Sequence, residues 1–172
     1  MTSLDRLDVE ILGRLPDTLR PGVAEIATKL GVSRATVQHR LTRLETDDVL
    51  LGYQPVIDLS AIGLVVNALI SLDIDQRVMG RIVEGLRALP EVLEVRIQAG
   101  REDLLVSVSL ESLEALQTLT AAIVGIDGVR KTTSTFTVST PVAHRTQPLL
   151  ERLTADSGWG RSTPAPTVSS KP

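Results

Sequence analysis

The sequence predicts an α+β protein with an N-terminal winged helix-turn-helix domain and a C-terminal ferredoxin-like βαββαβ domain. Two short helical patterns meet at a glycine within residues 20–52, as in a helix-turn-helix. Strand and helix patterns then follow in the order β, α, β, β, α, β, which is the ferredoxin-like order. We expect a helix-turn-helix domain over residues 1–48, a linker strand over 49–63, the βαββαβ domain over 64–140 and a Pro/Ser/Thr-rich tail over 141–172.

The first predicted helix lies close to the chain start. We expect Ser3 to cap its N-terminus, because a serine hydroxyl accepts a hydrogen bond from a free backbone N–H group of the first turn. Pro16 should end the helix, because proline lacks the N–H that continues a helix. The apolar residues at helical spacing are Leu4, Leu7, Ile11, Leu12 and Leu15.

Two further helices form the helix-turn-helix pattern. Gly31 lies between them and tolerates the positive φ of a tight turn. Ser33 is a suitable N-cap for the second helix, and Asp48 is expected to adopt the left-handed conformation at its end. The inward-facing residues of the two helices are Ala24, Ile26, Ala27, Leu30, Val37, Leu41 and Leu44.

The outward face of the second helix is basic and rich in hydrogen-bonding groups. Residues 31–43 contain three arginines and no acid, whereas the first 60 residues contain seven Lys or Arg and nine Asp or Glu. A basic helix in an acidic region is typical of a surface that contacts nucleic acid. The alternative is the ordinary solvated face of an amphipathic helix. We expect the chain to bind double-stranded DNA through this helix.

The outward side chains divide by the part of DNA that each suits. In the major groove a glutamine pairs with adenine and an arginine with guanine. The candidates for base contacts are Arg34, Gln38 and His39. The candidates for phosphate contacts are Ser33, Thr36, Arg40 and Arg43. For Arg40 the alternative is a structural ion pair with an acid such as Glu45 or Asp47.

The βαββαβ domain begins with a strand whose two faces differ. Every even position of residues 64–74 is apolar, whereas the odd positions combine Val65 and Leu69 with polar residues. The following elements are a helix over 78–89 that Pro90 ends, strands over 92–99 and 104–110 joined by a turn at Gly100, a helix that Ser112 caps and Gly125 ends, and a strand over 129–140.

One face of this predicted sheet lacks a cover, because both helices of a βαββαβ domain pack on the other face. Val65 and Leu69, with Phe136 or its strand neighbours, suggest that a second copy of the chain covers it. The alternative is a scatter of exposed apolar residues without a partner. We expect a homodimer, and a higher-order homo-oligomer remains open.

The tail differs in composition from the rest of the chain. It holds five of the nine prolines together with many serines and threonines. Residues 147–153 can form one or two helical turns, whereas residues 162–172 are expected to be disordered. Trp159, the only tryptophan, is either an anchor for the tail or an exposed side chain.

Composition limits the classes of protein that fit. The 172 residues carry a net charge of −3 and 42% hydrophobic residues, so a core is expected and any DNA contact must come from a local basic patch. The chain has no cysteine, no apparent signal peptide and no span of about 20 apolar residues. We expect a cytoplasmic, nucleoid-associated protein with no membrane contact, no metal and no cofactor.

With these elements in order, the chain resembles the Lrp/AsnC family, the feast/famine regulators of bacteria and archaea. The resemblance covers residues 4 to about 140. Asp48 stands where the family usually has glycine, and Glu102 and Leu104 flank Asp103 where an aromatic is common. The residues that fit the family pattern are Leu4, Asp5, Asp8, Ile11, Leu12, Leu15, Glu25, Ala27, Gly31, Ser33, Arg40, Leu44, Glu45, Gly52, Tyr53, Gly100, Asp103, Gly128 and Val129.

This resemblance implies a transcriptional regulator whose oligomeric state or DNA affinity responds to a small molecule, and an amino acid is the class of effector that we expect. Gly100 and Asp103 of this chain match the Gly-x-x-Asp motif in the effector-sensing and oligomerisation domain of the family. Asp103 would bind the α-ammonium group of an amino acid, and Gly100, Thr133 and Thr135 would bind its carboxylate. The alternative for Gly100 and Asp103 is an ordinary hairpin turn.

Two other functions remain as alternatives. One is an amino-acid-sensing module that acts by protein contacts and has a vestigial helix-turn-helix. The other is an enzyme similar to sirohaem decarboxylases, which use histidine in the C-terminal domain. The histidines here are His39 and His144, and neither lies in the predicted sheet. We therefore expect no enzyme activity and no catalytic residues.

Overall fold

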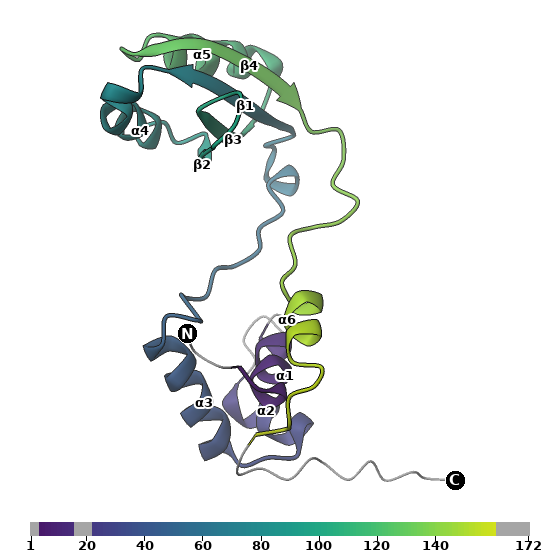
Figure 1. Cartoon of the computed structure of the whole chain (residues 1–172). Coiled ribbons are helices and arrows are strands. Elements are labelled where there is room, and N and C mark those ends of the chain that lie inside the picture. Colours follow the sequence, from purple (N-terminus) through teal and green to yellow (C-terminus); the bar gives the residue numbers. More distant parts are fainter. Residues whose placement is uncertain (1–3, 16–21, 161–172) are drawn as a thin grey trace. The chain divides into compact units, whose positions relative to one another are not determined.

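The computed structural model describes residues 4–15 and 22–160. These residues form two compact units (Figure 1). The first, which we call the N-terminal unit, combines the described residues of 1–54 with those of 143–172, and the second, the sheet unit, comprises residues 55–142. No helix of the described residues is long and apolar enough to cross a membrane.

The N-terminal unit is built from four helices: α1 (Arg6–Arg14), α2 (Val23–Leu30), α3 (Arg34–Thr46) and α6 (Gln147–Leu153). The first three have the apolar stripes that the sequence predicted, and these stripes meet in one core. Trp159 also packs against this core, so it anchors the tail and is not merely exposed. The buried core residues are Leu7, Ile11, Ile26, Ala27, Leu30, Val37 and Leu41.

The ends of α1 differ from the prediction. The N-cap is Asp5, and it forms a capping box in which Asp5 and Asp8 each accept the backbone N–H of the other at 3.0 Å. The prediction of Ser3 as the cap was therefore wrong, and Ser3 itself lies outside the described residues. The helix ends at Arg14, and Pro16, predicted to end it, is also outside the described residues.

The turns around α3 agree with the prediction. Gly31 has φ 66°, and the Ser33 hydroxyl accepts a hydrogen bond from the Thr36 N–H at 3.0 Å. Asp48 has φ 53°, which is the left-handed conformation expected after α3. These local signals determine where α3 begins and ends.

Residues 51–58 do not form a strand in the single chain. They are part of the segment that the sequence predicted as a linker strand. A strand needs a neighbour for its backbone hydrogen bonds, and these residues have none within the described chain. Leu51 and Val56 are exposed. A short 3₁₀ helix, Ser60–Ile62, follows before the sheet begins.

The sheet unit has the predicted βαββαβ order. The elements are β1 (Val66–Ile74), a 3₁₀ turn (Gln76–Val78), α4 (Met79–Arg87), β2 (Val92–Ile97), β3 (Leu104–Leu110), α5 (Leu113–Val124) and β4 (Val129–Phe136). The strands form one antiparallel sheet in the order β2-β3-β1-β4. Strands β2 and β4 end earlier than predicted, at Ile97 and Phe136.

Both helices of this unit cover the same face of the sheet (Figure 1). The even positions of β1 from Ala68 to Ile74 are buried there against Ile82 of α4 and Leu119 of α5. The odd positions, including Leu69, lie on the opposite face, which we call the open face, and are only partly buried. This agrees with the predicted difference between the two faces.

The prediction named Phe136 or its strand neighbours for the face of Leu69; Thr135, a neighbour, lies opposite Leu69, whereas Phe136 itself lies on the helix-covered face. Strand pairing sets Phe136 opposite Ala68, whose side chain is in the core. Together with α5 residues such as Leu116 and Val124, Phe136 lines an apolar groove at the sheet edge. The open face is therefore formed without Phe136.

Candidate nucleic-acid interface and effector loop

The outward residues of α3 fall into two groups. Ser33, Arg34, Gln38 and His39 are exposed, whereas Arg40 and Arg43 are partly buried. Thr36 is also partly buried, and its hydroxyl lies 2.8 Å from that of Ser33. The structure thus brings the predicted base-contacting residues together on one solvent-facing side of the helix.

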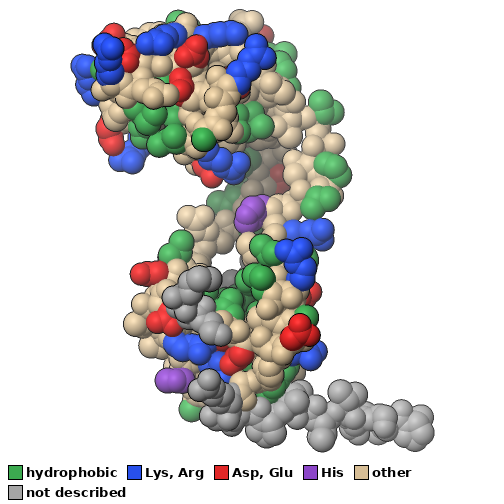
Figure 2. All heavy atoms as spheres, viewed as in Figure 1, with side chains coloured by type: hydrophobic (Ala, Val, Ile, Leu, Met, Phe, Trp, Pro, Cys, Tyr) green, Lys and Arg blue, Asp and Glu red, His purple; other side chains and the backbone are tan. Residues whose placement is uncertain are grey.

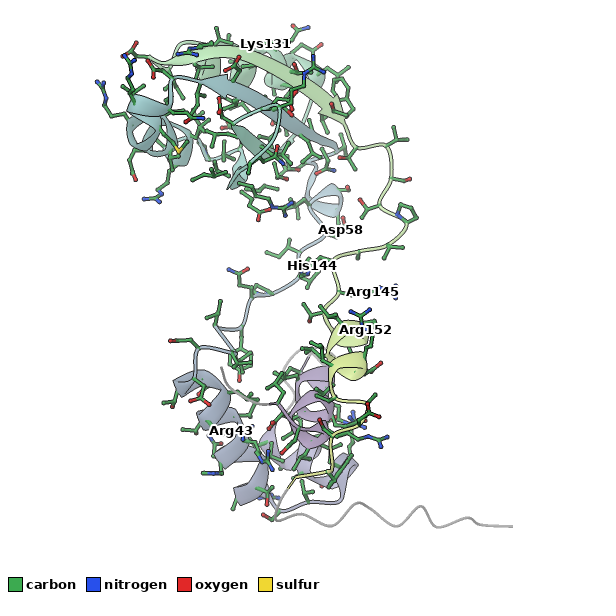
Figure 3. The ribbon with its side chains drawn as sticks, in the orientation of Figure 1. Arg43, Asp58, Lys131, His144, Arg145 and Arg152 are labelled. Carbon is green, nitrogen blue, oxygen red and sulfur yellow. The ribbon has the colours of Figure 1, made fainter. Side chains whose placement is uncertain are left out.

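Arg40 and Arg43 point inward and meet a buried carboxylate of α1. Asp8 is 0% exposed and binds Nη1 of Arg40 at 3.0 Å and Nη2 of Arg43. Arg40 also binds Asp5 at 2.5 Å. Figure 3 shows Arg43 projecting from α3 toward α1. We call these four residues the α1–α3 ion-pair cluster.

The cluster keeps Arg40 charged and fixes α3 to α1. Burial by itself lowers the pKa of Arg40, but hydrogen bonds and the negative charges of Asp5 and Asp8 outweigh it and raise this pKa above its ordinary value. Arg40 does brace the fold, as one alternative held, but its partners are Asp5 and Asp8. Glu45, an acid named for that role, instead accepts a hydrogen bond from the Tyr53 hydroxyl at 3.3 Å.

The remaining exposed residues of α3 are chemically suited to DNA. Arg34 takes part in none of the salt bridges formed by the described residues. On the visible face of the N-terminal unit, basic and acidic side chains are mixed and form no single basic field (Figure 2). On this visible face, any electrostatic contact with an anionic partner would rely on individual cations and not on a broad basic field.

The predicted effector residue Asp103 already has partners in the fold. Its carboxylate accepts the Ile74 N–H at 2.9 Å and the Gln76 side-chain amide at 2.8 Å. These two hydrogen bonds, with the backbone bond first, lower the pKa of Asp103 below its ordinary value. Asp103 thus holds the end of β1 to the β2–β3 loop. This structural role is the one expected if Gly100 and Asp103 form an ordinary hairpin turn.

The other effector candidates are differently placed. Nothing lies within 4 Å of a Cβ built on Gly100, and its φ is not positive, so the fold itself does not require glycine there. Thr133 and Thr135 are exposed on β4, opposite Ser71 and Leu69. β1 lies between β3 and β4, so the strand of these threonines and the strand that Asp103 precedes are not paired with each other.

Two features of the site were missed from the sequence. The role of Asp5 and Asp8 in holding α3 was not predicted, although their i, i+3 spacing signals a capping box. The contact of the tail with α1 was also missed, because it joins residues as distant as Val9 and Gln147.

Comparisons with known proteins match both units. The AsnC-type helix-turn-helix domain family matches residues 4–45, and the Lrp/AsnC ligand binding domain family matches residues 67–147. The HTH-type transcriptional regulator AldR of Mycolicibacterium smegmatis is 31% identical over 117 residues, which is 66% of this chain and 68% of AldR. The Bkd operon transcriptional regulator of Pseudomonas aeruginosa is 27% identical over 153 residues, which is 87% of this chain and 100% of that protein.

The fold has solved counterparts. The structure of Escherichia coli AsnC has a TM-score of 0.77 and 25% identity, and covers 86% of this chain and 100% of that chain. A transcriptional regulator of Neisseria meningitidis in complex with L-Met has a TM-score of 0.76 and 23% identity, and covers 84% of this chain and 96% of that chain. At this identity the second comparison shows the fold alone.

Proposed function

We propose that this chain, which belongs to the Lrp/AsnC family of transcriptional regulators, binds specific operator DNA through the exposed face of α3. The observation that carries the proposal is the division of α3 into two sides. Arg40 and Arg43 are paired with α1, whereas Arg34, Gln38 and His39 remain exposed beside them. Such a regulator would act at the nucleoid.

Each exposed group has a distinct expected role in the complex. Arg34, Gln38 and His39 contact base edges in the major groove, where each bidentate pair discriminates by about 1 to 3 kcal/mol. Ser33 and Thr36, at the N-terminus of α3, contact phosphates. Arg43 is one-third exposed, so it contributes to phosphate binding while its other side remains on Asp8. Arg40, at 12% exposure, acts chiefly within the fold.

Operator selection with the full chain tests this proposal. Genomic fragments are selected with the wild-type protein, and affinity is then measured for the best fragment and for a scrambled duplex. A triple variant, Arg34→Ala, Gln38→Ala and His39→Ala, should lose the preference for the operator. A matched triple variant on the exposed side of α5, Glu114→Ala, Gln117→Ala and Thr118→Ala, should keep it. An unchanged preference in the α3 variant would favour the vestigial helix-turn-helix alternative.

For the sheet unit we propose an amino acid as the effector, bound near Gly100 and Asp103. Each carboxylate oxygen of Asp103 accepts one hydrogen bond in the fold, which leaves lone pairs for an α-ammonium group. The free space at Gly100 lets a ligand approach the backbone there. The N. meningitidis protein of the same fold was solved with L-Met, which supports an amino acid as the class of ligand.

Calorimetric titration of the common amino acids tests the effector site. We expect one of them to bind the wild type and to change its operator affinity, and DNA must then change the affinity for that amino acid by the same factor. Asp103→Asn should abolish the binding while the chain still binds DNA. Asp127→Asn, at another exposed loop of this unit, should leave the binding intact. Absence of binding by every amino acid would refute this part of the proposal.

The open face of the sheet supports a homodimer through the sheet unit. Leu69 lies on this face, which neither α4 nor α5 covers. Two copies packed by this face would place two α3 helices about 34 Å apart, or at a multiple of that spacing, on a near-palindromic site. Light scattering of the full chain should give a dimer or a larger closed assembly. Leu69→Glu should dissociate it and Val124→Glu, on α5, should not; a monomeric wild type would contradict the proposal.

A further inference from the structure

The tail returns to the N-terminal unit and packs along α1. We call residues 147–160 the C-terminal strap. The Gln147 side-chain amide donates to the Val9 carbonyl at 3.3 Å, and the Arg6 N–H donates to the Gly158 carbonyl at 3.3 Å. The strap therefore contacts α1 at two separated points.

Gly13 makes room for the first of these contacts. A Cβ at residue 13 would lie 2.6 Å from Nε2 of Gln147, closer than atoms can approach. Glycine within a helix costs roughly 0.5 to 1 kcal/mol relative to alanine. Any larger side chain at residue 13 would therefore displace the Gln147 amide group from its contact with α1.

The second half of the strap enters the core and reaches the ion-pair cluster. Trp159 packs against the apolar core between the helices, and Thr154 is buried with its hydroxyl bonded to the Leu150 carbonyl at 2.9 Å. Gly160 follows directly. A Cβ at Gly160 would lie 2.5 Å from Nη2 of Arg40 and 3.0 Å from Oδ2 of Asp5.

The backbone of Gly160 thus lies directly against the Arg40–Asp5 ion pair. This contact excludes water from one side of the pair, and a lower local dielectric strengthens both its charge attraction and its hydrogen bond. Gly160 has φ 111°, a conformation that favours glycine, and a Cβ at this position would displace the Arg40 guanidinium group.

We propose that the strap is a positioning element for the recognition helix: Trp159 and Gly160 hold Arg40 against Asp5 and so fix the orientation in which α3 meets DNA. This inference rests on the proposed function of α3. Specific contacts require side chains held to within about 0.5 Å of their productive positions, whereas non-specific binding to phosphates does not. Loss of the strap contact should therefore reduce the preference for the operator.

Gly160→Ala and Gly158→Ala form a matched pair for the test. Nothing lies within 4 Å of a Cβ at Gly158, and its φ is not positive, so Gly158→Ala should behave as the wild type. In the full chain, Gly160→Ala should weaken operator binding about tenfold, the equivalent of one base contact, and leave binding to a scrambled duplex unchanged. The slope of affinity against salt should also stay the same, because the phosphate contacts are retained.

Trp159 supplies a second test and a direct signal. As the only tryptophan, it should emit at longer wavelength when the strap detaches. Trp159→Phe, which keeps an aromatic ring in the core, should retain the operator preference, whereas Trp159→Ala should lose it. Equal binding by Gly160→Ala and Gly158→Ala, or an equal loss on both duplexes, would overturn the inference alone. A wild type that does not distinguish operator from scrambled DNA would overturn the proposed function of α3, and with it this inference.

Discussion

Different kinds of interaction stabilise the interior of each of the two units of this protein. In the sheet unit, buried apolar residues of β1, β3, α4 and α5 form one continuous core. In the N-terminal unit, three short helices share a smaller core, and a buried carboxylate with two arginines joins α1 to α3. A segment from the far end of the chain completes that core.

The difference shows how each unit can serve its proposed role. In the N-terminal unit, the buried stripe of Val37, Leu41 and Leu44 turns one side of α3 toward the core. Charge-assisted hydrogen bonds have direction, so Asp5 and Asp8 add a second constraint on α3 by holding Arg40 and Arg43 against α1. The contacts of Arg40 and Arg43 with α1, together with the buried stripe of α3, leave Arg34, Gln38 and His39 on the exposed side of the helix.

Breaking the apolar core of the sheet unit should have the largest effect. Leu72 is 0% exposed, and Leu72→Ala should lower the free energy of unfolding of this unit by about 4 kcal/mol, through lost burial and the cavity that remains. Urea unfolding followed by far-ultraviolet circular dichroism measures the change. Trp159 fluorescence, which reports only on the N-terminal unit, should be unaffected; a shift of both signals would mean that the units unfold together.

Breaking the ion-pair cluster should have the next largest effect, now on the N-terminal unit. Asp8→Asn keeps the size of the side chain but leaves Arg40 and Arg43 facing a neutral group, which should cost about 3 kcal/mol of unfolding free energy. Urea unfolding followed by Trp159 fluorescence measures it. Glu10→Gln weakens a partly exposed pair with Arg14 within one helix and should cost less than about 1 kcal/mol. Equal costs for the two variants would remove the special role of Asp8.

Much of this organisation could be predicted from local patterns. The spacing of Val37, Leu41 and Leu44 gave the inward side of α3, and the tolerance of aspartate for positive φ gave the conformation of Asp48. Alternation along β1 gave the two faces of the sheet. Each of these depends on residues close together in sequence.

The errors arose where two local signals competed, where a strand pairing shifts, or where a tertiary contact decides the outcome. Ser3 and Asp5 are both good caps, and the returning hydrogen bond of Asp8 favours Asp5. Phe136 shares a face with Val129, seven residues earlier, because the pairing with β1 shifts at Asp73 and Ile74. The partners of Arg40 and the position of Trp159 depend on tertiary contacts that no local pattern contains.

A comparison of two helix caps sharpens the contrast between the units. Ser33 caps α3 and Ser112 caps α5, with hydrogen bonds of 3.0 and 3.1 Å. Each serine-to-alanine variant should cost its own unit about 1 kcal/mol of unfolding free energy. Only Ser33→Ala should also weaken operator binding, because α3 is the helix that we propose to contact DNA. Equal effects of the two variants on DNA affinity, measured by fluorescence anisotropy, would contradict this distinction.

The smallest expected effect is on the pH dependence of the sheet unit. The pKa of Asp103 lies below its ordinary value of 3.8, so its charged form stabilises the fold. This contribution is complete above about pH 4 and is lost as the pH falls through the lower pKa of the folded state. Asp103→Asn should be less stable than the wild type at pH 7, and this gap should narrow below pH 4. If the free energy of unfolding of the wild type and of Asp103→Asn changed with pH in parallel, the carboxylate charge would have no such role.

The base preference of the Gln38→Ala variant tests most directly whether the exposed side of α3 contacts the bases. Sequences would be selected from random duplexes by the full-length wild type, by Gln38→Ala and by Gln117→Ala as an exposed helical control. We expect Gln38→Ala to lose preference at one base pair of each half-site, at a cost of about 1 to 3 kcal/mol in operator affinity, while Gln117→Ala selects the wild-type sequences. A Gln38→Ala profile identical to that of the wild type would show that this side of α3 does not contact the bases.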